Sequence, residues 1–177
     1  MLMKIIHRIK PILLILGIVT LLVTSAWRTE AANTIVRYRL DPQSPYVNQF
    51  LESVAVPGNK EFLFLSGMVP PVINPNADPN TPQAYGDTKT QTKNILTNIQ
   101  AILKQRGYSM KDVIKVHGYL VGDPALNGKA DFNAFQDAYA EFFGSSQQPE
   151  IPVRTRTQVT QLVGPGWLVE IEVTAAK

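Results

Sequence analysis

Four charged residues near the C-terminus have the types and spacing that could do chemistry: Arg154, Arg156, Glu170 and Glu172. Each pair alternates with Val, Ile or Thr, a period of two that is typical of a half-buried strand. A guanidinium binds a carboxylate through two parallel N–H···O bonds. A carboxylate can hold and activate a water molecule. These two strands could therefore bind a small acid and hydrolyse it.

A Gly-rich turn joins the two strands, and the sequence predicts that they pair as a hairpin with all four charges on one face. With the turn centred on Gly164, Arg156 lies opposite Glu172, an ordinary cross-strand pair that contributes about 0.2–1 kcal/mol. Arg154 and Glu170 are then offset by roughly 13 Å and cannot neutralise each other. They are the candidate catalytic pair, and a solvated charged face with no function is the alternative.

Several kinds of chemistry are excluded by composition. Cys is absent, and the only His residues are His7 and His117. The sequence therefore excludes disulfides, thiolate metal sites and a Cys nucleophile, and it disfavours a His-based metal site or a Ser-His-Asp triad. The segment Gly122–Ala130 resembles a phosphate-binding loop, but it has the wrong Gly spacing and lacks the final Ser or Thr. We therefore expect no metal site built from Cys or His ligands.

The net charge of +3 comes largely from the N-terminal segment. Four basic residues precede position 32 (Lys4, Arg8, Lys10 and Arg28), opposed there only by Glu30. The remainder carries 13 basic and 13 acidic side chains. A nucleic-acid-binding protein needs a basic surface to displace counterions from phosphates. We therefore expect no nucleic-acid partner.

Residues 1–31 have the layout of a secretory signal peptide: basic residues, the apolar run Pro11–Val23, and then small residues. Cleavage after Ala26 or after Ala31 fits this pattern. An uncleaved anchor is the alternative, because Pro11–Trp27 is at the lower length limit for spanning a bilayer. The domain, residues 32–177, is then secreted or periplasmic, and it meets a membrane only if the segment is retained.

The remainder predicts one α+β domain in the order β-β-β-α-β-α-β-β. A hairpin is expected around Gly58-Asn59-Lys60, and Phe62–Leu65 is expected to be a central strand covered on both faces. The Pro-rich stretch Pro70–Pro82 is a loop. Helices are expected over Asp87–Arg106 and Asp131–Phe143. Because two helices cover only one face of such a mixed sheet, the apolar second face predicts a homo-oligomer packed through its sheets.

Six stretches occur in an order and spacing that resembles the reactive intermediate deaminase (Rid, YjgF-type) family: Ser66-Gly67, Thr90–Gly107, Asp112–Tyr119, Asp131–Phe143, Pro152–Thr155 and Val169–Val173. The resemblance implies a chorismate mutase-like fold and a homotrimer with ligand clefts between subunits. It further implies hydrolysis of 2-imino acids and their enamine tautomers to 2-keto acids and ammonia, without a cofactor. The longer Gly122–Lys129 segment suggests a divergent subgroup.

By this resemblance Arg154 binds the substrate carboxylate and Glu170 positions the attacking water. Ser66 and Gly67 match the Ser-Gly of the cleft wall. Three substrate-binding or cleft positions depart from the family pattern. Phe50 stands where the family has a cleft Tyr, unless Tyr46 supplies that Tyr from a shifted position. Gln136 replaces an Asn, and Arg156 stands where Cys is frequent. The alternatives to a deaminase are a non-enzymatic trimer that binds small carboxylates and a holdase-type protein of the same fold.

Overall fold

The computed structural model describes residues 33–177, and the predicted signal or anchor, residues 1–31, lies outside them. The described residues belong to two units. The larger unit comprises residues 36–55 and 61–177 and contains all the described strands and helices. The smaller unit includes residues 33–35 and 56–60, within which Asn59 Nδ2 donates a hydrogen bond to Asn33 Oδ1 at 2.8 Å. Across the described residues, no helix combines the length and apolarity needed to cross a bilayer.

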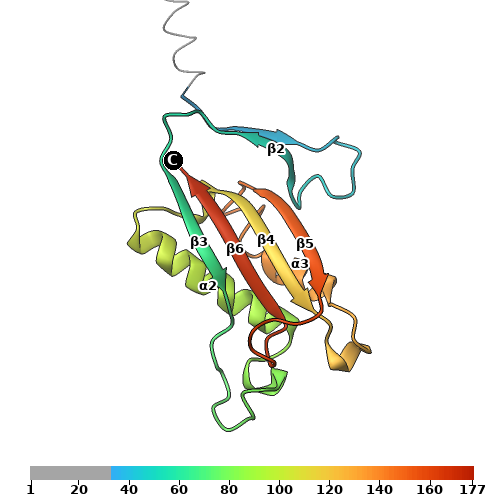
Figure 1. Cartoon of the computed structure of the whole chain (residues 1–177). Coiled ribbons are helices and arrows are strands. Elements are labelled where there is room, and N and C mark those ends of the chain that lie inside the picture. The colour runs from blue at the N-terminus through green and yellow to red at the C-terminus, as the bar shows by residue number, and fades with distance from the viewer. Residues whose placement is uncertain (1–32) are drawn as a thin grey trace, which may run out of the picture. The chain divides into compact units, whose positions relative to one another are not determined.

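The larger unit has the predicted order of strands and helices (Figure 1). The strands are β1 (Val36–Arg39), β2 (Leu51–Ala55), β3 (Phe62–Met68), β4 (Val113–Val121), β5 (Val153–Val159) and β6 (Val169–Ala176). The α-helices are α2 (Thr88–Gln105) and α3 (Phe132–Tyr139), and single 3₁₀ turns cover Pro82–Ala84, Met110–Asp112 and Pro124–Leu126. The stretch Pro70–Pro82 contains no strand, as its Pro content predicts.

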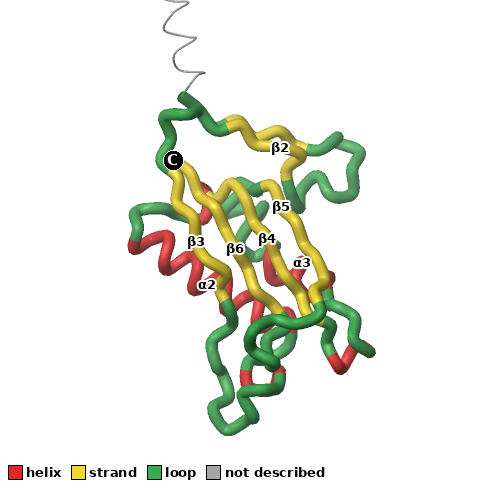
Figure 2. The backbone as a smooth tube through the Cα atoms, in the orientation of Figure 1, coloured by secondary structure: helices red, strands yellow, loops and turns green. Residues whose placement is uncertain are grey.

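Four strands form a mixed sheet in the order β3-β6-β4-β5, which Figure 2 shows side by side. β4 is parallel to β5 and antiparallel to β6, and β3 is antiparallel to β6. The predicted hairpin of the last two strands is therefore wrong, because β4 lies between them. The chain leaves β4, passes through α3 and returns in the same direction as β5, the connection that a parallel pair requires.

The hairpin predicted around Gly58-Asn59-Lys60 is also wrong, because β2 pairs with β1 while β3 pairs with β6. Nor is β3 a central strand. It is the edge of the four-stranded sheet, and Phe64 is 73% exposed. β2 pairs with the strand that precedes it and β3 pairs with the last strand of the chain, so the turn signal between β2 and β3 did not decide either pairing. The apolar residues on the outer side of β3 remain uncovered in a single chain.

The helix ends follow local capping chemistry. Asp87 Oδ1 accepts a hydrogen bond from the Thr90 amide at 2.8 Å, and Asp131 caps α3 in the same way. The chain leaves α2 through Gly107 at φ +77, a conformation that favours glycine. α3 ends at Tyr139 rather than at the predicted Phe143, because the chain continues there in hydrogen-bonded turns.

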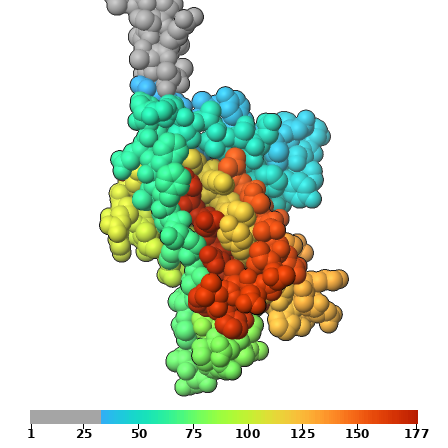
Figure 3. Space-filling view, in the orientation of Figure 1, coloured from blue at the N-terminus to red at the C-terminus, as the bar shows by residue number. Residues whose placement is uncertain are grey.

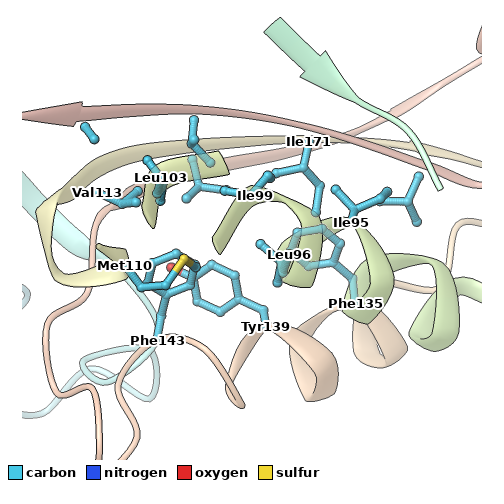
Figure 4. Packing of buried hydrophobic residues seen from close by; sticks show 14 of the residues in the cluster. Ile95, Leu96, Ile99, Leu103, Met110, Val113, Phe135, Tyr139, Phe143 and Ile171 are labelled. Atoms are coloured by element: carbon cyan, nitrogen blue, oxygen red, sulfur yellow. The ribbon is translucent and has the colours of Figure 1, made fainter. Parts of the chain in front are cut away.

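Both helices pack against one face of the sheet, as predicted. The apolar stripe of α2, Ile95, Leu96, Ile99 and Leu103, is fully buried and meets the aromatic side chains of α3 and the inner side of β6 (Figure 4). Among the described residues, no helix covers the opposite face. Figure 3 looks onto that face, where β6 is visible between β3 and β4. We call it the open face.

Candidate functional site

The register of the sheet decides which face each charged residue occupies. Val116 of β4 pairs with Arg154 of β5 on one side and with Val173 of β6 on the other, so these three side chains point toward the helices. Tyr119 pairs with Glu170, and both point to the open face. Arg154 and Glu170 therefore lie on opposite faces of one sheet.

The prediction that the four charges share a face is thus wrong, and so is the Arg156–Glu172 pair. Arg156 pairs in register with Gly118, and Glu172 pairs with His117. Only β6 has the expected orientation, with its acidic residues on the open face. The reason is the parallel pairing of β5 with β4, which places Arg156 on the helix side.

On the helix side, uncharged side chains from three parts of the chain contact Arg154. Its Nη1 donates to Gln136 Oε1 of α3 at 2.7 Å, and its Nη2 donates to Gln49 Oε1 at 3.4 Å. The guanidinium lies 4.4 Å from the ring centre of Tyr139 and 5.3 Å from that of Phe50. Flat rings and amide oxygens fix its plane without removing its charge.

Arg154 has no counter-ion among the residues that the structure describes. Burial lowers its pKa to about 10, which leaves it charged at neutral pH. Burial also raises the pKa of Tyr139, so that hydroxyl stays neutral. Within residues 33–177, no carboxylate forms an ion pair with Arg154. It borders a cavity of about 340 Å³ lined by Leu40, Phe50, Leu51, Glu52, Lys115, Val153, Arg154 and Thr155.

Both residues proposed for the family's cleft Tyr lie near this guanidinium. Phe50 is one of its ring contacts, and the Tyr46 ring stacks on Phe50 with the ring centres 6.1 Å apart. Tyr46 is 52% exposed. The segment before β2 therefore supplies an aromatic cover beside Arg154, with a phenol at its outer end.

On the open face, Glu170 lies against the Ser66-Gly67 step of β3. The register of β3 on β6 shifts between Leu65 and Met68, so these two residues form an irregularity in the strand. A methyl group added at Gly67 would collide with the Glu170 carboxylate. Gly67 therefore leaves the space that the Glu170 carboxylate occupies, and Ser66 precedes it in the same irregularity of β3.

A second polar group adjoins Glu170 on the open face. The Tyr119 hydroxyl donates to Glu172 Oε2 at 2.7 Å, and this bond raises the pKa of Tyr119. The His117 ring stacks on Tyr119 with ring centres 4.2 Å apart. His117 Nε2 is buried without a hydrogen-bond partner in the described structure. The open face thus carries acceptors and a ring nitrogen as well as the exposed phenylalanines.

The predicted site residues accordingly form two half-sites. The arginine half-site comprises Arg154, Gln136 and Phe50, and the carboxylate half-site comprises Glu170, Ser66 and Gly67. Sequence reasoning missed Gln49 and Tyr139 in the first half-site and Tyr119 in the second. Tyr139 follows Gln136 by three positions, so the helical period could have placed it beside the same guanidinium. No local pattern marks Gln49.

In residues 33–177, His, Asp and Glu side chains nowhere form a group of three that could hold a metal ion. The two half-sites contain guanidinium, amide and carboxylate groups, which are suited to binding an acid and moving a proton.

Comparison with known proteins gives a consistent result. A family model described as Endoribonuclease L-PSP matches residues 38–177. A RutC family protein of Pyrococcus horikoshii is 40% identical over 117 residues, 66% of this chain and 79% of that protein. The 3-aminoacrylate deaminase RutC of Acinetobacter baylyi is 33% identical over 133 residues, 73% of this chain and 85% of that protein.

The fold has a solved counterpart. A Yersinia pestis protein of unknown function from the conserved Rid family superposes with a TM-score of 0.61 at 23% identity, over 81% of this chain and 98% of that one. This likeness shows the shared α+β fold. The family match, residues 38–177, covers β2 through β6 and therefore includes both half-sites.

Proposed function

Because the chain belongs to the Rid (YjgF/RutC) family, we propose that it hydrolyses reactive 2-imino acids and their enamine tautomers to 2-keto acids and ammonia. One observation carries the proposal: Arg154 is a half-buried cation beside a cavity, held by neutral partners and left without a carboxylate of its own among residues 33–177. The family relative named as a 3-aminoacrylate deaminase supports the reaction class.

Arg154 binds the carboxylate of the substrate. Gln136 and Gln49 hold the guanidinium plane, so two parallel N–H···O bonds form without reorganisation. The rings of Tyr139 and Phe50 exclude water from one side and strengthen the ionic contact. Held in this way, the substrate presents its imine carbon in a fixed position.

Glu170 supplies proton transfer. Its carboxylate accepts a proton from a water molecule as the water oxygen bonds to the imine carbon, and the imine nitrogen takes up a proton. Glu170 then gives its proton to the amino nitrogen of the carbinolamine, the C–N bond breaks to release ammonia, and the hydroxyl group loses its proton to solvent and becomes a carbonyl. The overall change is addition of water and release of ammonia, and no covalent enzyme intermediate is required.

We propose that the two half-sites come from two copies of the chain, since Arg154 and Glu170 face away from each other across one sheet. The proposed contact joins the open face of one copy to the β5 edge of the next, which carries Arg154. Phe62 and Phe64 stack on the open face at 6.0 Å, and they are 42% and 73% exposed. Covering this surface removes apolar area from water, and the homotrimer typical of the family would do so.

The test uses an amino-acid oxidase to generate 2-iminopropanoate and semicarbazide to trap what remains of it. We expect Arg154→Ala and Glu170→Gln each to abolish the acceleration given by the wild type. If both variants keep the wild-type activity, the proposed chemistry is refuted. Arg106→Gln removes one positive charge at the exposed C-cap of α2, outside both half-sites, and serves as the control.

Mixing the two inactive variants tests the shared site directly. After unfolding and refolding together, some interfaces combine the intact Arg154 of one chain with the intact Glu170 of another. Random assembly restores about a quarter of wild-type activity, because each interface draws its two sides independently. If both groups act within one chain, no intact site can arise and the mixture stays inactive.

A carboxylate-binding protein without catalysis is the second candidate, because the arginine half-site is assembled on one chain without Glu170. Its signature is 2-ketobutyrate binding that survives Glu170→Gln and is lost in Arg154→Ala, with no imine hydrolysis. The equal numbers of basic and acidic groups in residues 32–177 argue against nucleic-acid binding, and therefore against the endoribonuclease activity named in the description of the family model.

We also propose that the domain is exported. The support is the basic, apolar and small-residue order of residues 1–31. The N-terminal mass of protein from the native host tests this: a start at Trp27 or Ala32 shows cleavage, the intact sequence in a membrane fraction shows an anchor, and the intact sequence in the cytoplasm refutes export.

A further inference from the structure

A second guanidinium follows the first along β5. Arg156 lies two residues after Arg154 on the same face, so their Cα atoms are roughly 6.6 Å apart. Arg156 Nη1 donates to the Phe132 carbonyl oxygen at 2.7 Å. Its guanidinium lies 5.5 Å from the ring centre of Phe132 and 5.8 Å from that of Phe135. The hydrogen-bond and ring partners of Arg156 are therefore uncharged, like those of Arg154.

Neither arginine is neutralised by the described part of the chain. Within residues 33–177 the ion pairs involve Arg37, Lys89 and Lys93, and both β5 arginines are partly buried. Burial lowers the pKa of each, and the charge of Arg156 lowers that of Arg154 further. Two like charges in a partly desolvated place are costly unless an anion joins them.

Arg156 also keeps free donors. A guanidinium has five N–H donors, and in the described structure Arg156 uses Nη1 for the Phe132 carbonyl. Nearby, Gln158 fixes the loop before α3 through Ala130 and Gly128. That loop therefore has an anchor of its own next to Arg156.

We infer that Arg154 and Arg156 together select acids with a second carboxylate, so that the preferred ligands are dicarboxylic 2-imino acids and the matching 2-keto acids. Arg154 binds the carboxylate next to the reacting carbon, and Arg156 binds the distal one. This inference rests on the proposed function for its reaction, and on the two uncompensated guanidiniums for its specificity.

The test measures binding of 2-oxoglutarate and 2-oxobutyrate, which differ by one distal carboxylate, by titration calorimetry on the assembled protein. We expect the wild type to bind 2-oxoglutarate about 10- to 100-fold more tightly, the effect of one charged hydrogen-bonded contact. Arg156→Gln should remove this preference and leave 2-oxobutyrate binding unchanged. Arg156→Lys should retain part of it, and Arg106→Gln should retain all of it.

The outcomes separate the inference from the proposed function. Equal wild-type affinity for the two acids, or equal weakening of both by Arg156→Gln, overturns the inference and leaves Arg156 as an anchor for α3. Selective dicarboxylate binding without imine hydrolysis supports the inference and rejects the deaminase. Hydrolysis of 2-iminopropanoate and of the imine of glutamate with the same kcat/KM supports the deaminase and rejects the selectivity.

Discussion

Replacing Gly67 by Ala moves the proposed general base without changing its chemistry. The added methyl group would occupy the position of the Glu170 carboxylate, 2.7 Å from its Cδ and 3.1 Å from its Cγ. The obstacle is the far end of a flexible side chain on the open face, so Glu170 can rotate away while the backbone of β3 stays in place. The change therefore acts on the position of one carboxylate.

The two expected magnitudes differ greatly. Forcing Glu170 into a poor rotamer costs about 0.5–1.5 kcal/mol, and a cost near 1 kcal/mol lowers the melting temperature of a domain of this size by about 2–8 °C. A general base out of position loses roughly 10²–10⁴ in rate. We expect kcat to fall at least about 100-fold, with KM little changed because Arg154 is untouched.

The assay follows 2-iminopropanoate decay by semicarbazide trapping for the wild type, Gly67→Ala, Glu170→Gln and Gly58→Ala. Gly58 is the matched control, because a methyl group there meets no described atom within 4 Å. Full activity of Gly67→Ala beside an inactive Glu170→Gln would refute the assigned position of the carboxylate. A fall in melting temperature far beyond the expected range would assign Gly67 to folding instead.

Three further changes test other parts of the structure. Gly118→Ala places a methyl group 3.0 Å from the buried Phe135 ring and should destabilise the fold by about 1–3 kcal/mol; an unchanged urea midpoint contradicts this. Phe64→Lys should convert the assembly to monomer by light scattering with its circular dichroism retained, and a persistent oligomer argues against the open face as the interface. Asp87→Ala removes the bond from the Thr90 amide and should cost about 0.5–2 kcal/mol at neutral pH. That bond is the main reason the pKa of Asp87 is lowered, so the stabilisation is present above the unfolded pKa and is lost as pH falls through the folded one. The difference between Asp87→Ala and the wild type should therefore close in acid, and a constant difference in urea midpoints would contradict the cap.

The sequence predicted features that depend on local chemistry. Asp87 and Asp131 marked both helix starts, because a side-chain oxygen can satisfy amides only a few residues ahead. Gly107 marked the end of α2, because the positive φ there suits glycine. The order of the strands and helices followed from the same local signals and from hydrophobic periodicity.

Strand pairing was predicted wrongly, because it is decided by contacts between whole segments and not by the local turn signals. Alternation in β5 showed that Arg154 and Arg156 share a face, but it did not show which face meets the helices. The expectation that charges point outward fits Glu170 and Glu172. It fails in β5, where α3 offers Gln136 and aromatic rings to the guanidiniums.

The open-face side of β3 also shows that the sequence alone does not decide which segment covers a strand. Phe62–Leu65 predicted a strand covered on both faces, and in one chain only the Leu63 and Leu65 side packs against the core. The pattern did indicate that the outer side of β3 is apolar. The pattern alone could not say whether a further strand, a helix or another copy of the chain would cover it.

The division of the half-sites between two faces has a consequence for how the protein behaves on dilution. In the proposed mechanism, a lone chain carries the guanidinium that binds the acid and the carboxylate that accepts the proton on opposite faces of its sheet, so the two cannot reach the same molecule. Turnover per chain should therefore fall as the protein is diluted below the concentration at which copies associate. Newly made chains would be inert until enough of them accumulate, which gives the reaction a threshold set by abundance.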